Sequence, residues 1–281
     1  ALGYVLAVYW LAAHCLEGVF KRSLATALIV FGSGLGMAVW AANKISGGHF
    51  PLPLDLQGVG AFGYLINNPH FTRAGICCAL QYAFLIRGEQ TGRLRYFLYS
   101  GLAAEGHSIL RPYHVPETFL LYLALPILLC ALERAHYRRR ALHYTAAILV
   151  ALPGALYLVV SAMTNVLGMA GWQRQSPQLL EQILWLGFPY LAVCLHFAIF
   201  GMTRIRQARV STLILGAWLL VAWLQCAAGP YLTIGHEQAF YALTIAPAIL
   251  LFLGPLPEAY TLLQTYAPRI AATFTKPWGR R

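Results

Sequence analysis

The chain has 281 residues, of which 59% are hydrophobic and only 10% are charged, and its formal net charge is +11. A soluble domain usually carries about 25% charged residues, so this composition excludes an ordinary soluble protein and predicts an all-α polytopic membrane protein. The basic residues lie in small clusters between apolar runs. That distribution is typical of a protein that fixes its orientation in a membrane, and it argues against a nucleic-acid partner.

Several apolar segments reach or approach the roughly 20 residues needed to cross a hydrocarbon core of about 30 Å. In lipid every backbone polar group needs an internal partner, so these segments are expected to be α-helices. The nine predicted spans are 1–20, 24–43, 69–86, 94–110, 116–132, 142–161, 182–203, 211–228 and 238–254. Together they form one transmembrane domain, 1–254, and residues 255–281 are predicted to be a cytoplasmic tail that is partly an interfacial helix.

When the connections are assigned to alternate sides, 16 of the 20 Lys and Arg residues fall on one side and four on the other. Positive charge is retained in the cytoplasm. This predicts a multi-pass protein of the bacterial cytoplasmic (inner) membrane, with its N-terminus outside and its C-terminus cytoplasmic. Most acidic residues and five histidines fall on the outer side, so any chemistry is expected at the outer face.

The first candidate site in chain order is the long outer loop 44–68, which contains Asp55, the only aspartate in the chain. Asp55 is a candidate base or ligand of a divalent cation. The next span begins at Asn68-Pro69, which places His70 on its first turn and Arg73 three residues later. A helix entry of this kind can hold an anion through its free N–H groups, although simple capping by the asparagines is the alternative.

The densest candidate site is the predicted outer turn from Glu105 to Glu117, which joins two spans. Helical spacing places His107 and Arg111 on one face. Pro112 is expected to force Arg111 out of the helix, and Glu117 would lie in the first turn of the next helix, near its positive dipole end. The guanidinium group of arginine matches phosphate with a bidentate fork, and His107 and His114 can exchange protons. The alternative is a turn whose polar side chains only reach the lipid headgroups.

A third candidate is His236-Glu237, which precedes the last span from the outer side and could close over the same site. Capping of that helix is the alternative. The six cysteines lie in apolar runs without metal-binding spacing, so we expect packing residues and no structural metal site. Motifs of soluble phosphate-binding loops, serine hydrolases and zinc proteases do not occur in the sequence.

One stretch resembles a known family. It opens a span with Asn68-Pro-His-Phe71, continues to the basic turn Arg87-Gly-Glu-Gln-Thr-Gly-Arg-Leu-Arg-Tyr96, and then to Ser100-Gly-Leu-Ala-Ala and Leu110-Arg-Pro-Tyr-His-Val115. This order is similar to the central and C-terminal region of large bacterial membrane proteins with the type-C glycosyltransferase architecture. The resemblance covers residues 60–260 loosely. Arg111 stands where that pattern has a histidine, and His114 follows.

The resemblance implies an enzyme that transfers sugar from a polyprenyl-phosphate donor at the outer face. Arg111 with His107 or His114 would bind the lipid phosphate. Asp55 or Glu105 would act as base or hold a divalent metal ion. Such enzymes carry an acidic catalytic loop after their first span, where this chain has Lys21-Arg22, so that loop is expected upstream of Ala1 or is missing.

Two other functions remain open. The first is a transporter or flippase for a lipid-linked or anionic substrate, with Arg111 and Arg73 in a central cavity. The second is a non-catalytic subunit of a membrane complex, which would have a membrane-protein partner chain. The partners expected in every case are membrane lipids.

Overall fold

The computed structural model describes residues 2–31, 45, 47, 69–111, 114–132, 136–164, 210–232, 246–251 and 253–254. Within these ranges the regular structure is helical, which confirms the all-α prediction. The helices are α1 (Leu2–Cys15), α2 (Val19–Phe31), α5 (Pro69–Thr91), α6 (Leu94–Leu110), α7 (Val115–Leu132), α8 (Tyr137–Met163) and α12 (Val210–Leu232). A short helical segment follows at 246–251. The predicted spans 24–43 and 238–254 are described only in part, and the span 182–203 and the tail 255–281 lie outside the described residues.

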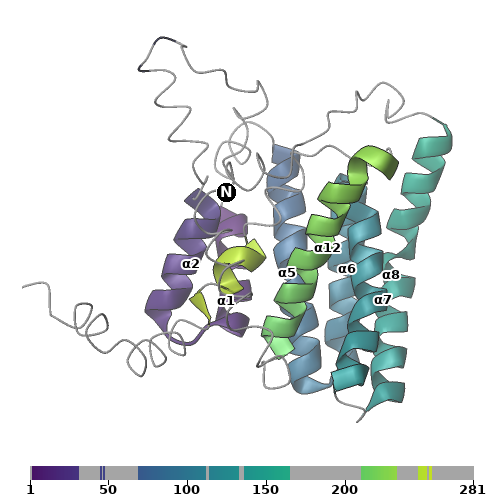
Figure 1. Cartoon of the computed structure of the whole chain (residues 1–281), viewed down its shortest axis with the longest axis horizontal. Helices are drawn as coiled ribbons and strands as arrows, with labels where there is room; N and C mark the ends of the chain where they lie inside the picture. The colour runs from purple at the N-terminus through teal and green to yellow at the C-terminus, as the bar shows by residue number, and fades with distance from the viewer. Residues whose placement is uncertain are drawn as a thin grey trace, which may run out of the picture.

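Helices α5, α6, α7, α8 and α12 run roughly parallel or antiparallel to one another, with α1 beside α5 and α2 beside α1 (Figure 1). Helix α6 packs between α5 and α8. The contact between α6 and α8 is close because Gly101 has no side chain: a Cβ atom there would lie 2.6 Å from the carbonyl oxygen of Ala147. Removing one side chain lets two backbones approach, as is common between helices in membranes.

The first turn of the chain lies earlier than predicted. Helix α1 ends at Cys15 and α2 begins at Val19, and Gly18, with a left-handed φ of +82°, lies in the connection directly before α2. The Arg22 Nε–H donates a hydrogen bond of 2.9 Å to the Leu16 carbonyl, so it caps the end of α1. Lys21 and Arg22 therefore belong to the first turns of α2 and not to a loop between spans.

Polar contacts bring together the C-terminal ends of α1 and α5 and the N-terminal ends of α6 and α8. We call this end of the bundle the basic end. The turn at Gly92 joins α5 to α6. Near it, Arg140 of α8 contacts Glu89 of α5 at 3.2 Å, and the Gln90 side chain donates to the carbonyl of His14 in α1. The basic residues on or beside these helix ends are Lys21, Arg22, Arg87, Arg93, Arg95, Arg138, Arg139 and Arg140.

The outward faces of these helices are apolar. Large hydrophobic side chains are exposed along α6, α7, α8 and α12, among them Leu102, Ile109, Leu120, Leu123, Ile127, Leu149, Leu156, Val159, Val160, Leu220 and Leu224. One described helix, Tyr137–Ser161 within α8, is long and apolar enough to cross a membrane, and α1, α7 and α12 contain shorter apolar stretches. The bundle thus has apolar outward faces and buries polar side chains such as Arg111 and Glu117 in its interior.

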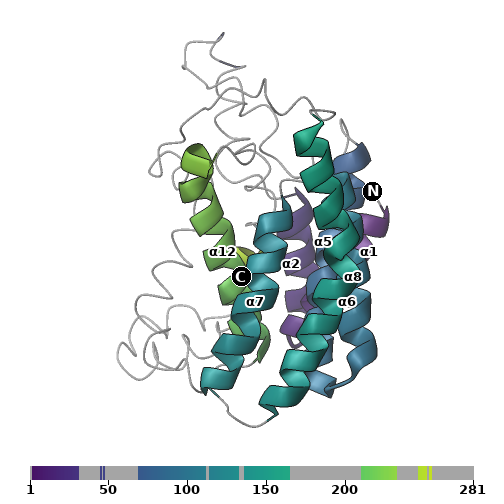
Figure 2. The same cartoon turned by 90° about the vertical axis from the view of Figure 1, so that its right-hand side faces the viewer.

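The hairpin of α6 and α7 is shorter than the helices around it. Ser108 of α6 lies level with Gly154 of α8, and α8 continues from there to Met163, about 13 Å further at 1.5 Å per residue. Gly106 likewise lies against Cys77 of α5, about 12 Å along that helix from its start at Pro69. Figure 2 shows α8 extending beyond the start of α7. The α6–α7 turn is therefore recessed within the bundle.

Candidate functional site

The recessed turn is built by the backbone around Arg111. Helix α6 ends at Leu110, and Arg111 has φ −144° and ψ 80°, outside the helical region as expected for a residue before proline. The Arg111 N–H still donates to the carbonyl of His107 at 2.8 Å, and the His114 N–H donates to the carbonyl of Arg111 at 3.1 Å. These two bonds keep the turn tight, so side chains from the end of α6 and the start of α7 point into the same space.

Four of the predicted site residues are buried at this turn. The exposed fraction is 4% for Arg111, 2% for His107, 0% for His114 and 2% for Glu117. A turn at the headgroup level would expose these groups to water. Their burial excludes simple headgroup anchoring, and we call these four residues the recess cluster.

Glu117 is the centre of the hydrogen bonding. Its Oε1 accepts a hydrogen bond from the Tyr82 hydroxyl at 3.2 Å, and its Oε2 lies 3.2 Å from His114 Nδ1. Glu117 also lies in the first turn of α7, where the helix dipole favours a negative charge. The carboxylate therefore fixes the orientation of the His114 ring.

His107 is buried without a polar partner. Its ring stacks on that of His114, with centroids 4.9 Å apart and planes 17° apart, but neither ring nitrogen has a hydrogen-bond partner among the described residues. Buried polar groups in native proteins nearly always have a partner, which can be protein, water or ligand. His107 therefore indicates that the recess holds something polar beyond the described side chains.

Arg111 supplies the positive charge of the recess cluster. Its charge interacts electrostatically with Glu117, His107 and His114. Burial lowers the pKa of His114 well below its usual value, and the neighbouring His107 and Arg111 lower that pKa further. The His114 imidazole is therefore neutral at physiological pH. A neutral imidazole can accept a proton during a reaction, and a guanidinium can hold an anion.

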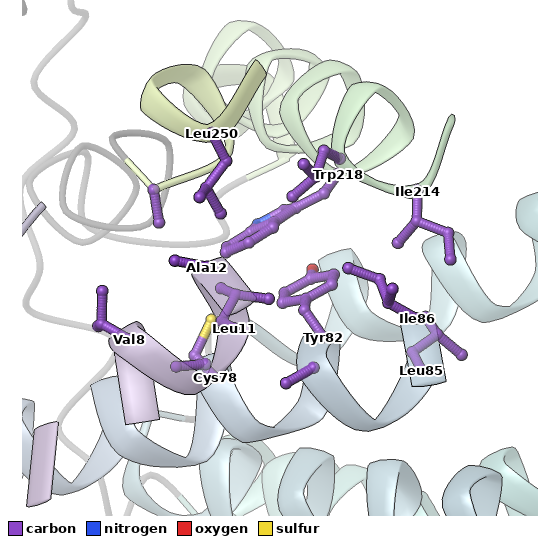
Figure 3. Close-up of a cluster of buried hydrophobic side chains, with 14 of the residues drawn as sticks. Val8, Leu11, Ala12, Cys78, Tyr82, Leu85, Ile86, Ile214, Trp218 and Leu250 are labelled. Atoms are coloured by element: carbon purple, nitrogen blue, oxygen red, sulfur yellow. The ribbon is translucent and has the colours of Figure 1, made fainter. Parts of the chain in front are cut away.

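Two aromatic residues support the recess cluster and were missed by the sequence analysis. The ring of Tyr82 stacks on that of Trp218 from α12, with centroids 3.6 Å apart and planes 10° apart (Figure 3). This stack holds the Tyr82 hydroxyl towards Glu117. Both residues lie in apolar spans and look like ordinary packing residues in the sequence, so only their long-range contacts reveal this role.

The structure does not bring every candidate residue to the recess cluster. Glu105 is half-buried and lies about 200° around α6 from His107, because each residue turns the helix by 100°. Arg73 is exposed on α5, and for His70 only the helical backbone is described. Asp55, His236 and Glu237 lie outside the described residues, so the predicted convergence of the 49–70 segment with this turn remains a prediction.

The described residues hold no group of three or more His, Cys, Asp or Glu side chains that could bind a metal ion. The recess cluster has one carboxylate, Glu117, which already contacts Tyr82 and His114. Its donor set fits an anion better than a divalent cation, because a hard cation needs several oxygen ligands. The sequence analysis proposed Asp55 or Glu105 as a ligand of a divalent metal ion, and Asp55 lies outside the described residues.

The recess cluster thus combines a buried guanidinium, a neutral imidazole held by a carboxylate, and a second imidazole without a described partner. Comparison of the chain with models of known families, with curated proteins and with solved structures finds no match.

Proposed function

We propose that this chain is a multi-pass membrane protein that binds the phosphate of a polyprenyl-phosphate-linked sugar at the recess cluster and acts as a glycosyltransferase at the outer face. The observation that carries the proposal is the buried Arg111 beside His107, His114 and Glu117 on a recessed helix turn. Ionisable residues inside a membrane are costly and are functional by default.

The distribution of polar and apolar groups supports a membrane location. The exposed faces of α6, α7, α8 and α12 carry large hydrophobic side chains, while Arg111, Arg140, Glu117 and three histidines are buried. A water-soluble bundle keeps its charged residues at the surface. Lipid around the bundle would explain the apolar exterior, because it is as apolar as the side chains that face it.

The two ends of the bundle support the orientation. The basic end collects the arginines of α2, α5, α6 and α8, as expected on the cytoplasmic side. The α6–α7 turn is at the opposite end of both helices. If the basic end is cytoplasmic, the recess cluster faces the outer half of the membrane, where a lipid-linked sugar donor presents its phosphate.

The chemistry of the recess cluster suits a phosphate leaving group. In glycosyl transfer the acceptor oxygen forms a bond to the anomeric carbon, the bond from that carbon to the phosphate oxygen breaks, and the acceptor proton passes to a base. Arg111 would stabilise the charge that develops on the phosphate. A neutral imidazole oriented by Glu117 would be a suitable base, in addition to Asp55.

Binding of polyprenyl phosphate by the purified full chain tests the phosphate site. Arg111→Lys keeps the charge but loses the bidentate fork, and we expect about tenfold weaker binding, equivalent to ~1.4 kcal/mol. Arg111→Ala should lose most binding. The matched control is Arg95→Ala, which removes an exposed arginine at the basic end. Unchanged binding in Arg111→Ala, with control and variant equally folded, would reject the phosphate site and favour the structural-subunit interpretation.

Sugar transfer is tested separately from binding. With a lipid-linked sugar donor, the enzyme should release polyprenyl phosphate, and Asp55→Asn should lower turnover while leaving lipid binding largely intact. A transporter or flippase would instead move its substrate without sugar release. Buried polar side chains that continue from the recess cluster towards the basic end favour this second candidate.

A further inference from the structure

A series of buried polar side chains connects the recess cluster with the basic end, and we call it the polar column. It runs inside α5, α6, α7 and α8. From the basic end its members are Arg140, Glu89, Tyr144, Tyr122, Ser100, Gln81, Tyr82, Glu117, His114 and His107.

The column begins with a buried ion pair. The Arg140 Nε–H donates to Glu89 Oε2 at 3.2 Å, and the Arg140 Nη1–H donates to the carbonyl of Leu129 at 3.4 Å. Both charged side chains are largely removed from solvent. Tyr144 lies beside Glu89 one turn further along α8, with its ring edge-to-face against Tyr122 at a centroid distance of 6.3 Å.

The middle of the column is a directed pair of hydrogen bonds. The Ser100 hydroxyl donates to the carbonyl of Gln81 at 2.8 Å. Because a serine has a single proton to donate, the contact of 2.7 Å between Ser100 Oγ and the Tyr122 oxygen must be donated by the tyrosine. The remaining part, from Tyr82 through Glu117 to His114, belongs to the recess cluster and its support.

Two gaps interrupt these bonds, and both contain buried polar atoms without a described partner. In the gap between Glu89 and Tyr122, the Tyr144 hydroxyl faces Glu89, but neither Glu89 Oε1 nor the Tyr144 oxygen has a described partner at hydrogen-bond distance. In the gap between Tyr122 and Tyr82, the buried side chain of Gln81 faces the Tyr122 hydroxyl, but neither amide atom of Gln81 has a described partner at hydrogen-bond distance. Buried atoms of this kind are usually satisfied by internal water, which needs two to four polar partners. The gaps are therefore the places where water would complete the column.

We infer that internal water joins these side chains into a path that carries protons between the basic end and the recess cluster. Hydroxyls, carboxylates and waters can each accept a proton on one side while releasing another on the other side. The carbonyl and amide groups of Gln81 cannot do this, so they would only orient the water that links the hydroxyls of Tyr122 and Tyr82. Every step breaks one O–H or N–H bond and forms another, so no oxidant or reductant is needed. The path spans about 12 Å from Glu89 to Gln81 and continues to Glu117 and the histidines.

The apolar surroundings of the column restrict what it can carry. The side chains packed around it include Leu85, Phe97, Leu121, Leu125 and Ala147, all fully or nearly fully buried. A hydrated ion would need a continuous water-filled pore between these side chains. A proton needs only a single chain of hydrogen-bonded side chains and water molecules. Proton exchange with the recess cluster would serve either proposed function, because both place an anion next to neutral histidines. The inference rests on the proposed membrane location but not on phosphate as the ligand.

Proton flux in proteoliposomes tests the inference. The purified full chain is reconstituted with a trapped pH dye, and a potassium gradient with valinomycin supplies the driving potential. We expect the internal pH of wild-type vesicles to change faster than that of protein-free vesicles. The two column variants are Tyr122→Phe, which removes one hydroxyl and keeps the ring, and Glu89→Gln, which removes the charge. Both should return the flux to the protein-free rate.

The matched control is Tyr157→Phe, which removes a hydroxyl from the exposed face of α8 and should leave the flux at the wild-type rate. Wild-type flux equal to that of protein-free vesicles would overturn the inference. So would an unchanged flux in Tyr122→Phe. Gel filtration of each variant checks its folding, and polyprenyl phosphate binding measured on the same preparations separates failure of the proton path from failure of the phosphate site.

Discussion

Replacement of Glu117 by glutamine tests how the recess cluster balances its charges. The substitution keeps the side-chain shape, and the amide oxygen can still accept from Tyr82, which lies 3.2 Å away. It replaces the carboxylate oxygen Oε2, which contacts His114 Nδ1 at 3.2 Å, with an amide group that cannot accept from that nitrogen. A hydrogen bond to a charged group contributes about 1.5–3 kcal/mol, and we take the upper end, ~3 kcal/mol, because this contact is buried.

The same change should have the opposite effect on ligand binding. The charge of Arg111 interacts with Glu117, so an incoming phosphate must compete with that carboxylate for Arg111. Glu117→Gln should therefore bind polyprenyl phosphate more tightly than wild type does, although the unliganded variant is less stable. Added ligand should recover part of the lost stability, since ligand binding to the folded state raises the free energy of unfolding.

Thermal unfolding of the detergent-purified protein, with and without polyprenyl phosphate, measures both effects. For a protein of this size ~3 kcal/mol corresponds to a fall in Tm on the order of 10 °C. The control is Glu105→Gln, which removes the charge of a half-buried carboxylate on another face of α6. A Glu117→Gln protein with the wild-type Tm and unchanged ligand affinity would show that Glu117 neither stabilises the recess cluster nor competes with the ligand for Arg111.

Three further outcomes are expected. Gly101→Ala should lower the free energy of unfolding by about 1–3 kcal/mol, measured by denaturant titration, because its Cβ would lie 2.6 Å from a backbone oxygen of α8; an unchanged stability would mean that the two helices are not in close contact. The lowered pKa of His114 means that the unfolded state binds more protons than the folded state below the usual value of 6.5, so stability should fall as pH drops through that value. His114→Asn should lessen this dependence, whereas His136→Asn, at an exposed residue, should not. Cysteine labelling should place 134–140 inside and 44–68 outside, and labelling of both from the same side would contradict the nine-span prediction.

Much of the helical architecture follows from local sequence. The predicted range 94–110 coincides with α6, and α7 begins one residue before its predicted start. Both boundaries depend on local chemistry: Pro112 excludes a helical Arg111, and Pro116 and Glu117 suit a helix start. The predicted end of the first span, residue 20, was less accurate, because α1 ends at Cys15 and a left-handed Gly18 precedes α2. Hydropathy alone does not predict such a change in backbone conformation.

The sequence also identified the residues of the recess cluster but not their environment. The spacing of His107, Arg111, His114 and Glu117 placed them on one turn, and a turn predicts exposure to headgroups as readily as burial. Their burial depends on how far α5 and α8 extend past the α6–α7 hairpin, which is set by packing between distant segments such as Gly154 and Ser108. No local pattern encodes that relative height.

The contacts of Tyr82 belong to the tertiary structure for the same reason. The residue lies 35 positions from Glu117 and 136 positions from Trp218 in the sequence, and in its own helix it is an aromatic among apolar neighbours. The length of the apolar runs determined which segments were predicted to be helices, because that signal is local. The meeting of a hydroxyl, a carboxylate and an indole at one depth was decided only when the helices packed, because it depends on their rotation and relative height.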